Sequence, residues 1–402
     1  QRLGIYDKSA EKKLASMPER FLIHAVSVGE IQVAFRFMAE MRAKRPGSAF
    51  VLTTTTSTAH ALAEKMINKD DVLLYFPVDF PFIVRRVLRQ IKPIGLILVE
   101  SELWPNLVRL SSARNIPIML LNGRISNRSF RRYRLVRSLV RRILAYFSLC
   151  CMQSEQDAER LIELGADPLL VKITGSAKYD IAGSSFKVDE KDENFIKTLQ
   201  SLGFSAPNLL LVAGSTWPGE ELALLKIIIR LRGLFPRLKL VLVPRHAERR
   251  KQVRAEITQS GLDFRLWSQC RESGAVGNEP SVLLVDTTGE LRAFYSVADV
   301  VFIGKSLTAK GGQNPIEAAV CSKPIIVGPH MENFSAVIGD FIESKAVIQA
   351  ADENALEKAV AGLLADKAER ESMGGKACRV VLAKSGAVSK SADLFLNIFR
   401  NY

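Results

Sequence analysis

The sequence predicts an α/β protein built from two Rossmann-like, doubly wound domains that face each other across a cleft. Three observations lead to this fold class. The chain has 402 residues, which suits two domains of ordinary size. In both halves, short β-rich runs alternate with amphipathic segments of helical length, the pattern of βαβ units with parallel strands. Each half also opens with a strand, a loop of small residues and a Gly-Glu pair at a helix start, Gly29-Glu30 in one and Gly219-Glu220 in the other.

The first half, residues 1–181, is expected to form one domain with a parallel sheet and helices between its strands. A polar stretch rich in Gly, Ser, Asp and Lys follows, so residues 182–206 are predicted to be a linker. The strands of this domain are expected near residues 21–27, 49–54, 72–76, 95–99, 117–121, 148–152 and 170–174.

The same alternation resumes after the linker and defines a second domain over residues 207–385. Residues 352–401 have helical character, with breaks expected at Gly374-Gly375 and Ser385-Gly386, and the helix over 386–402 could cross back to the first domain. Ligands of such sheets bind at the carboxyl ends of the strands, so the cleft between the domains is the expected site. The strands of the second domain are expected near residues 209–213, 239–243, 282–285, 299–303 and 324–327.

The composition is that of an ordinary folded protein. With 48% hydrophobic and 24% charged residues, the chain is neither disordered nor collagen-like. The five cysteines and four histidines are scattered, apart from Cys150-Cys151 inside an apolar run, and no CxxC or HExxH pattern occurs. We therefore expect reduced core thiols, no metal site and no cofactor.

Basic residues are concentrated in the first half. The net charge is +14, and the stretch from Leu103 to Ser154 contains ten arginines and no acidic residue. Such a field suits nucleic acid, an anionic membrane surface or a phosphorylated substrate, and a solvated basic face is the plainer alternative. Between Arg124 and Arg142, arginines at helical spacing alternate with apolar residues, as in interfacial helices, whereas aromatic interleaving for base stacking is sparse.

Three acidic positions in the first half are candidates for proton transfer or acceptor binding. Glu30 lies in the first turn of a helix, after the small residues Ser27 and Gly29. It either stabilises the helix dipole or serves as a general base, because apolar neighbours make a carboxylate a better proton acceptor. Glu100 and Glu102 close an apolar strand, and for Glu102 both helix capping and acceptor binding are open.

In the second half, candidate residues follow the predicted strands. Arg245 ends a strand and either forms a surface salt bridge or anchors a phosphate. Gly311 and Gly312 would let the backbone approach a phosphate or nucleoside closely. Asn314 and Glu317 are predicted to be the N-cap and N3 residues of the next helix.

In order along the chain, these motifs resemble those of the 3-deoxy-D-manno-octulosonic acid (Kdo) transferases of Gram-negative lipopolysaccharide synthesis. The resemblance extends from the first residues to about Phe334. The motifs that carry it are His24-Ala25-Val26-Ser27-Val28-Gly29-Glu30, Glu100-Ser101-Glu102-Leu103-Trp104-Pro105-Asn106, Asn122-Gly123-Arg124-Ile125-Ser126, Gln153-Ser154-Glu155, Gly175-Ser176-Ala177-Lys178-Tyr179-Asp180, Ala213-Gly214-Ser215-Thr216, Val243-Pro244-Arg245-His246 and Gly311-Gly312-Gln313-Asn314-Pro315-Ile316-Glu317.

The resemblance implies a GT-B glycosyltransferase that is inverting and metal-independent. Its implied donor is CMP-Kdo, and its implied acceptor is the glucosamine disaccharide of a lipid A precursor. Glu30 matches the catalytic base of the family, while Arg245, the Gly311-Gly312 loop and Glu317 match its CMP-binding side. The implied location is the cytoplasmic face of the Gram-negative inner membrane, with an apolar anchor preceding the segment at which this chain starts.

The sequence departs from the family pattern at three places. Trp217 and Gln313 each stand where histidine is common, and Ser176-Ala177 stands where Asn-Leu usually precedes Lys178. We expect side-chain contacts with substrate to differ from the family at these places. We expect the class of reaction to be the same.

We expect the remaining candidates to divide between donor and acceptor. The backbone near Ser215 and Thr216, the helix start at Asn314 and the side chain of Arg245 would hold the leaving phosphate, and Lys178 would neutralise the carboxylate of the donor sugar. The stretch from Arg124 to Arg142 would bind the anionic bilayer. The expected acceptor-binding residues are Ser27, Gly29, Glu100, Glu102, Arg124, Arg128 and Arg131.

Two other classes of function stay open from the sequence. One is another nucleotide-dependent α/β enzyme, such as an oxidoreductase, but no GxGxxG followed by an acidic residue about 20 positions later supports dinucleotide use. The other is a basic nucleic-acid-binding protein. Because no known nucleic-acid-binding motif occurs, nucleic acid is not the expected partner.

Overall fold

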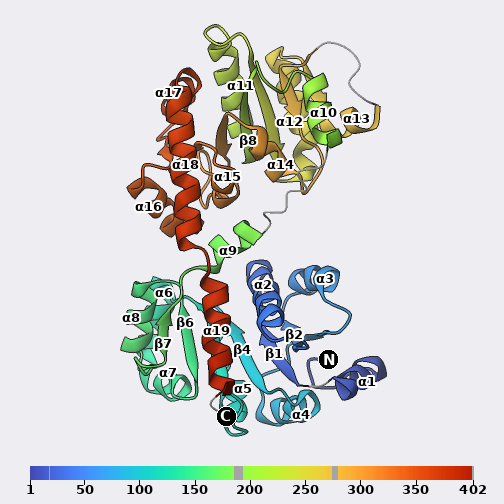
Figure 1. The fold of residues 1–402 in the computed structure, drawn as a ribbon, viewed down its shortest axis with the longest axis vertical. Coiled ribbons are helices and arrows are strands. Elements are labelled where there is room, and N and C mark those ends of the chain that lie inside the picture. Colours follow the sequence, from blue (N-terminus) through green and yellow to red (C-terminus); the bar gives the residue numbers. More distant parts are fainter. Residues whose placement is uncertain (18, 185–192, 274–278, 401–402) are drawn as a thin grey trace. The chain divides into compact units, whose positions relative to one another are not determined.

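The structure, a computed structural model, describes residues 1–17, 19–184, 193–273 and 279–400. The chain divides into two compact units: residues 1–181 with 384–402 form the first, and residues 182–383 form the second. Each unit contains its own seven-stranded sheet (Figure 1). The α/β class predicted from the sequence is confirmed.

The sheet of the first unit has the order β3-β2-β1-β4-β5-β6-β7, with every neighbouring pair parallel. The strand order reverses between β1 and β4, and such a switch point is where parallel sheets bind ligands. Helices cover both faces, so strand residues are almost continuously apolar and buried. The strands are β1 (Arg20–His24), β2 (Ala49–Thr54), β3 (Val72–Tyr75), β4 (Gly95–Val99), β5 (Ile118–Gly123), β6 (Leu149–Met152) and β7 (Val171–Ile173).

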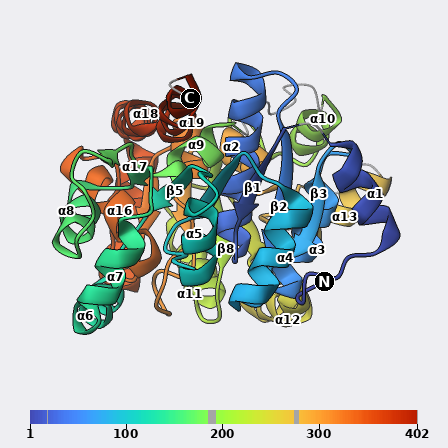
Figure 2. The same cartoon turned by 90° about the horizontal axis from the view of Figure 1, so that it is seen from below.

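The last helix of the chain belongs to the core of this first unit. Figure 2 shows α2 and α19 on one side of the strands and α4, α5 and α7 on the other. In α19, Phe395 packs against Phe21 and Phe37, with ring centroids 6.0 and 6.4 Å apart. The helices are α1 (Lys8–Ser16), α2 (Val28–Lys44), α3 (Ser57–Met66), α4 (Pro81–Ile91), α5 (Pro105–Ser112), α6 (Asn127–Leu135), α7 (Arg137–Leu144), α8 (Glu155–Glu163), α9 (Ala177–Ser184) and α19 (Ala387–Arg400).

The sheet of the second unit has the order β10-β11-β9-β8-β12-β13-β14 and is also parallel throughout. Its strand order reverses between β8 and β12. The strands are β8 (Leu209–Thr216), β9 (Leu238–Pro244), β10 (Phe264–Leu266), β11 (Val282–Leu284), β12 (Val300–Ile303), β13 (Ile325–Val327) and β14 (Ile348–Gln349). The helices are α10 (Glu193–Ser201), α11 (Glu220–Leu231), η1 (Ala247–Arg249), α12 (Arg250–Ser260), α13 (Trp267–Ser273), α14 (Leu291–Val297), α15 (Ile316–Val320), η2 (Glu332–Phe334), α16 (Ser335–Glu343), α17 (Glu353–Ala365) and α18 (Lys367–Lys384).

The structure corrects several boundaries expected from the sequence. Strands β10 and β14 were missed because they have three and two residues and lie at the two edges of their sheet. The break at Gly374-Gly375 is wrong, since α18 continues through it. A Cβ on Gly374 would lie 2.0 Å from the carbonyl oxygen of Ser322, so glycine serves close packing there. Part of the expected 182–206 linker folds as α10, which packs Phe195 against Trp267 at 5.3 Å, while residues 185–192 lie outside the described residues.

Candidate functional site

In the first unit, the candidate residues lie at the carboxyl edge of the sheet, beyond β1, β4 and β5. Helix α2 follows β1 with Ser27 as its N-cap, whose Oγ accepts a hydrogen bond from Glu30 N at 3.3 Å. In return, Glu30 Oε2 accepts a hydrogen bond from Val26 N at 2.8 Å. This reciprocal pair acts as a capping box and explains where the helix begins. It also fixes the Glu30 carboxylate, which is only 7% exposed.

Two further carboxylates share this edge with Glu30. Burial first, and then the charge of Glu30, raise the pKa of Glu100 and Glu102, and the pKa of Glu102 reaches about 7. A hydrogen bond of 2.9 Å from Trp104 Nε1 to Glu102 Oε2 acts in the opposite direction. Glu100 has a left-handed backbone, φ +61°, which a non-glycine residue adopts only where its surroundings hold it. Carboxylates that resist simultaneous ionisation are typical of sites that move protons.

Two cations act on the same group of carboxylates. The charges of Lys178 and Arg124 lower the pKa of Glu100, against the effect of burial. Burial, followed by the charge of Arg124, lowers the pKa of Lys178, whereas Glu100 raises it. Asn122 fixes the turn before Lys178, because its Oδ1 accepts a hydrogen bond from Ala177 N at 3.0 Å. The charged group of the first unit consists of Glu30, Glu100, Glu102, Arg124 and Lys178.

The arginine-rich stretch forms two helices instead of one continuous stripe. Helix α6 ends at Leu135 and α7 begins at the residue after Val136, whose backbone is not helical (φ −119°, ψ 32°). Arg124, which precedes α6, is exposed, as are Arg128 and Arg131 on the helix. Their side chains are therefore available to an anionic partner.

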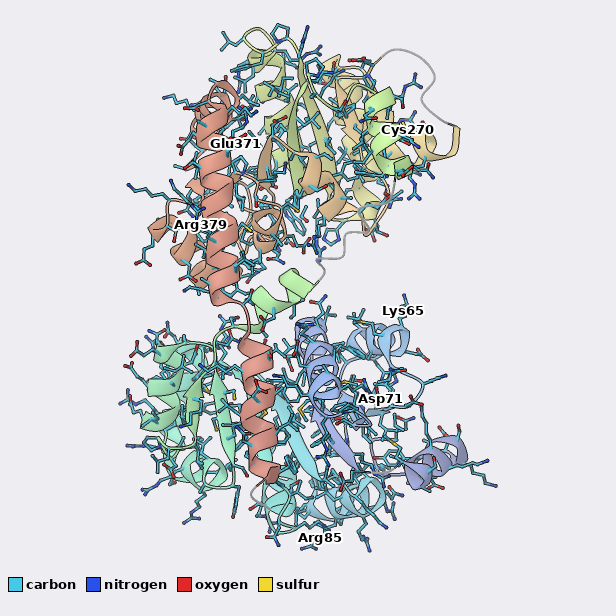
Figure 3. The ribbon with its side chains drawn as sticks, in the orientation of Figure 1. Lys65, Asp71, Arg85, Cys270, Glu371 and Arg379 are labelled. Atoms are coloured by element: carbon cyan, nitrogen blue, oxygen red, sulfur yellow. The ribbon has the colours of Figure 1, made fainter. Side chains whose placement is uncertain are left out.

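Large apolar side chains are exposed in the same unit. On α6 and α7, Leu135 is 86% exposed and Leu139 is 53% exposed. At the start of α4, the rings of Phe80 and Phe82 stack 6.0 Å apart and both are exposed, and Arg85, labelled in Figure 3, is exposed on the same helix. Helices α4 and α7 both contact α5, on one side of the sheet. Exposed apolar side chains next to arginines are typical of interaction surfaces.

In the second unit, the candidate residues lie at the end of β8 and beyond β9 and β12, again at the carboxyl edge. The ladder between β8 and β9 is irregular between Gly214 and Thr216, and Ser215 there has φ +55°. Such a bulge re-aims the chain and is frequent beside active sites. Thr216 is fully buried and its hydroxyl donates to Glu221 Oε1 at 2.8 Å, so its side chain is engaged within the unit. The carbonyl of Thr216 accepts a hydrogen bond from Arg245 N at 3.1 Å.

The Gly311-Gly312 loop is explained by contacts within its own unit. Both residues have positive φ, +120° and +70°. Gly311 N donates to Glu332 Oε2 at 2.6 Å and Gly312 N donates to the carbonyl of Lys305 at 3.0 Å. A Cβ on Gly312 would lie 2.4 Å from Met331 Sδ. Both N–H groups are thus bonded within their own unit, and packing against Met331 by itself requires glycine at position 312.

The helix after this loop starts one residue later than expected. Pro315, and not Asn314, occupies the N-cap position of α15. Asn314 Oδ1 accepts a hydrogen bond from the first N–H of the helix at 3.1 Å, and its Nδ2 donates to Glu317 Oε1 at 3.2 Å. Burial raises the pKa of Glu317, while this hydrogen bond and the charges of Arg292 and Arg245 lower it. Glu317 in α15 and Arg245 in the loop after β9 thus belong to one group.

Sequence reasoning missed the residues that hold the loop after β12. Glu220 is fully buried, and its carboxylate accepts hydrogen bonds of 2.8–2.9 Å from the N–H groups of Trp217 and of residues 305–307. The Nζ of Lys305 lies 4.5 Å from the centroid of the Trp217 ring. The Gly219-Glu220 pair marks a helix start in the sequence, but no local pattern shows that its carboxylate reaches a loop 85 residues away.

The structure thus brings most of the predicted residues into two groups, one in each unit. Within the described ranges, no set of three or more His, Cys, Asp and Glu residues is arranged to hold a metal ion. None of the helices in this part of the chain combines the length and the apolar character that a membrane span needs.

Comparisons with known proteins cover most of the chain. A family model described as 3-deoxy-D-manno-octulosonic-acid transferase matches residues 1–181, and one described as glycosyl transferases group 1 matches residues 270–379. A curated 3-deoxy-D-manno-octulosonic acid transferase of Haemophilus influenzae is 30% identical over 98% of this chain and 90% of its own length. That of Bordetella pertussis is 32% identical over 92% of this chain and 85% of its own length.

Solved structures of low sequence identity share the fold. A UDP-GlcNAc 2-epimerase from Neisseria meningitidis matches with a TM-score of 0.63 at 12% identity, over 96% of this chain and 100% of that one. A glycosyltransferase from Rickettsia africae matches with a TM-score of 0.61 at 11% identity, over 96% of this chain and 99% of that one. The fold is therefore GT-B-like, with two Rossmann-like units, as the sequence predicts.

Proposed function

The chain belongs to the Kdo transferases, a family of glycosyltransferases, and from this membership we propose that it moves Kdo from CMP-Kdo to the glucosamine disaccharide of a lipid A precursor. The proposed reaction inverts the anomeric configuration and uses no metal ion. The observation that carries the proposal is the group of Glu30, Glu100 and Glu102 at the carboxyl edge of the first sheet, with the cations Lys178 and Arg124 beside it.

Glu30 is the proposed general base. The Val26 N–H fixes its Oε2, and among the described residues no group donates to Oε1. That oxygen accepts the proton of the acceptor hydroxyl while the hydroxyl oxygen attacks the anomeric carbon of Kdo. The bond from this carbon to the phosphate oxygen breaks, and its electron pair leaves with CMP. Attack from the face opposite the leaving group inverts the configuration.

The other charged residues of the first unit position the substrates. The carboxylates of Glu100 and Glu102 accept hydrogen bonds from the sugar hydroxyls of the acceptor. The Ser27 hydroxyl and the backbone at Gly29 form further hydrogen bonds with these hydroxyls. Lys178 neutralises the carboxylate of Kdo. The exposed arginines Arg124, Arg128 and Arg131 pair with the phosphates of the lipid A precursor, because guanidinium groups bind phosphate oxygens in pairs.

The second unit holds the nucleotide of the donor. Glu317, half-buried and hydrogen-bonded to Asn314, accepts hydrogen bonds from the ribose hydroxyls. Arg245 is exposed beside the Ser215 bulge and binds the phosphate, with the backbone around the bulge as further donors. Negative charge grows on this phosphate as CMP leaves, and donors that are already fixed stabilise it most.

Helices α6 and α7 bind the anionic cytoplasmic face of the Gram-negative inner membrane. Their arginines are exposed, and so are the apolar side chains of Leu135 and Leu139 on the same two helices, as in helices that lie at a membrane interface. Each basic residue near an anionic surface contributes about 1 kcal/mol. The exposed rings of Phe80 and Phe82 add apolar area in the same unit.

The decisive experiment incubates the purified protein with CMP-Kdo and a lipid A precursor and weighs the products by mass spectrometry. The expected product exceeds the acceptor by whole Kdo residues, one CMP is released for each, and added EDTA changes neither. A matched reaction with UDP-GlcNAc as donor should yield no product. An unmodified acceptor with CMP-Kdo would refute the function, and loss of transfer in EDTA would refute metal independence.

A further inference from the structure

Lys305 carries a positive charge that forms no ion pair within the part of the chain that the structure describes. The residue follows β12 and is half-buried. Its Nζ lies over the Trp217 ring, 4.5 Å from the centroid, and Trp217 meets His246 edge-on at 5.1 Å. Lys305, Trp217 and His246 belong to the loops after β12, β8 and β9, so all three lie at the carboxyl edge of the second sheet.

The carboxylates that bind this loop are already engaged. Glu220 accepts hydrogen bonds from backbone N–H groups, including that of Lys305 itself at 2.8 Å. Glu332 accepts a hydrogen bond from Gly311 N at 2.6 Å and lies 3.5 Å from His330 Nδ1. The Trp217 ring stabilises the ammonium group through its π face but does not neutralise it. The charge is therefore available to an anion from outside the chain.

The backbone also holds Lys305 in one place. Lys305 and Ser215 both have positive φ, +53° and +55°. Their loops touch, because a Cβ on Gly304 would lie 2.5 Å from the carbonyl oxygen of Ser215. Non-glycine residues in this conformation store strain, which gathers at ligand clamps and active sites.

We propose that Lys305, oriented by Trp217, binds the phosphate of the CMP group of the donor together with Arg245. This inference rests on the proposed function, in which CMP-Kdo is the donor. Lys305 and Arg245 belong to the same sheet edge as Glu317, the proposed partner of the ribose. The phosphate of CMP is bonded to the ribose, so phosphate suits this position better than the carboxylate of Kdo does.

The test compares the affinities of the full chain for CMP and for cytidine by isothermal titration calorimetry. Lys305→Ala should weaken CMP binding roughly tenfold or more and leave cytidine binding unchanged, because only CMP carries the phosphate. Lys305→Arg should retain most of the affinity for CMP, and Trp217→Leu should lose part of it. Lys310→Ala, which removes an exposed lysine from the same loop, should change neither affinity.

The outcomes separate this inference from the function on which it rests. An unchanged preference for CMP over cytidine in Lys305→Ala overturns the phosphate site, and equal losses of both ligands in Trp217→Leu mean that the ring stacks on the base instead. A wild-type chain that prefers CMP through Lys305 but transfers no Kdo refutes the function and leaves the phosphate site intact. A wild-type chain that binds neither ligand refutes both. Misfolding is excluded if Lys305→Ala unfolds at the same temperature as the wild type and if Lys305→Arg restores the affinity for CMP.

Discussion

The carboxylate of Asp180 accepts a hydrogen bond from the backbone N–H of Val388, 2.7 Å away in space and 208 residues later in the sequence. Its other oxygen accepts the N–H of Gly386. Helix α19 begins at Ala387, so a buried side chain from α9 satisfies N–H groups at the start of the last helix. The first N–H groups of a helix have no partner within the helix, and an acceptor there stabilises its start.

Replacing Asp180 by Ala should loosen α19. Leaving a buried donor unpaired costs about 1–3 kcal/mol, which corresponds to roughly ten- to hundredfold faster opening. Hydrogen exchange of the α19 amides, read by mass spectrometry, measures this directly. Asp393→Ala is the matched control, because that carboxylate is 58% exposed and pairs with Lys44 at the surface. Equal protection of α19 in the two variants would contradict the capping role.

Glu30→Gln should stop transfer while leaving CMP binding intact. Glutamine has the same shape and its amide oxygen can still accept the Val26 N–H, so the helix start is preserved, but it takes up no proton. Loss of a general base lowers kcat by roughly 10²- to 10⁴-fold. Glu40→Gln, on the same helix and paired with Arg36, should keep wild-type turnover. Turnover retained in Glu30→Gln would remove this residue as the base.

Stability should depend on pH through Glu102. Burial, the charge of Glu30 and that of Glu100 raise its pKa from 4.5 to about 7. Between these values the folded chain holds a proton that the unfolded chain has released, so the contribution of Glu102 to stability falls as the pH rises through this window. Glu102→Gln, which stays neutral, should raise the Tm of the first unit more at pH 8 than at pH 5. Calorimetry that finds the same gain at both pH values would show that the pKa is not raised.

Neutralising three exposed arginines of α6 should weaken membrane binding. At about 1 kcal/mol each, the triple variant Arg128→Gln, Arg131→Gln, Arg132→Gln should bind phosphatidylglycerol vesicles roughly 100-fold less tightly. Co-sedimentation measures the affinity, with phosphatidylcholine vesicles as the uncharged reference. Replacing three exposed cations of the second unit, Lys226, Lys251 and Arg254, should have no effect. If the α6 variant keeps its affinity for the anionic vesicles, the membrane role of this helix is excluded.

The elements that could be predicted from the sequence are those whose cause is local. A run such as residues 95–99 is apolar at every position, because both faces of a parallel sheet are covered, and it is easily found. Ser27 and Glu30 stand three positions apart, the spacing of a capping box, and the helix starts between them. For the same reason, the positions of Glu100 and Arg245 at strand ends followed once the strands were located.

The features that could not be predicted depend on partners far away in the sequence. The residues next to Lys305 in the sequence do not indicate its contact with Trp217. That contact arises because β8 and β12 are adjacent in the sheet. Glu220 looks like any acidic residue in a first helical turn until its loop partners are known. Gly374 reads as a helix breaker, and only the nearness of Ser322 shows that it serves packing.

The return of α19 to the first unit has a consequence for biosynthesis. Phe395 covers the rings of Phe21 and Phe37, yet all of residues 182–383 are translated before it. At about 5–20 residues per second, the nascent apolar surface around Phe21 waits roughly 10–40 s for its cover. The middle of the chain therefore emerges from the ribosome before the first unit can be completed, and the apolar surface around Phe21 stays uncovered by α19 throughout that delay.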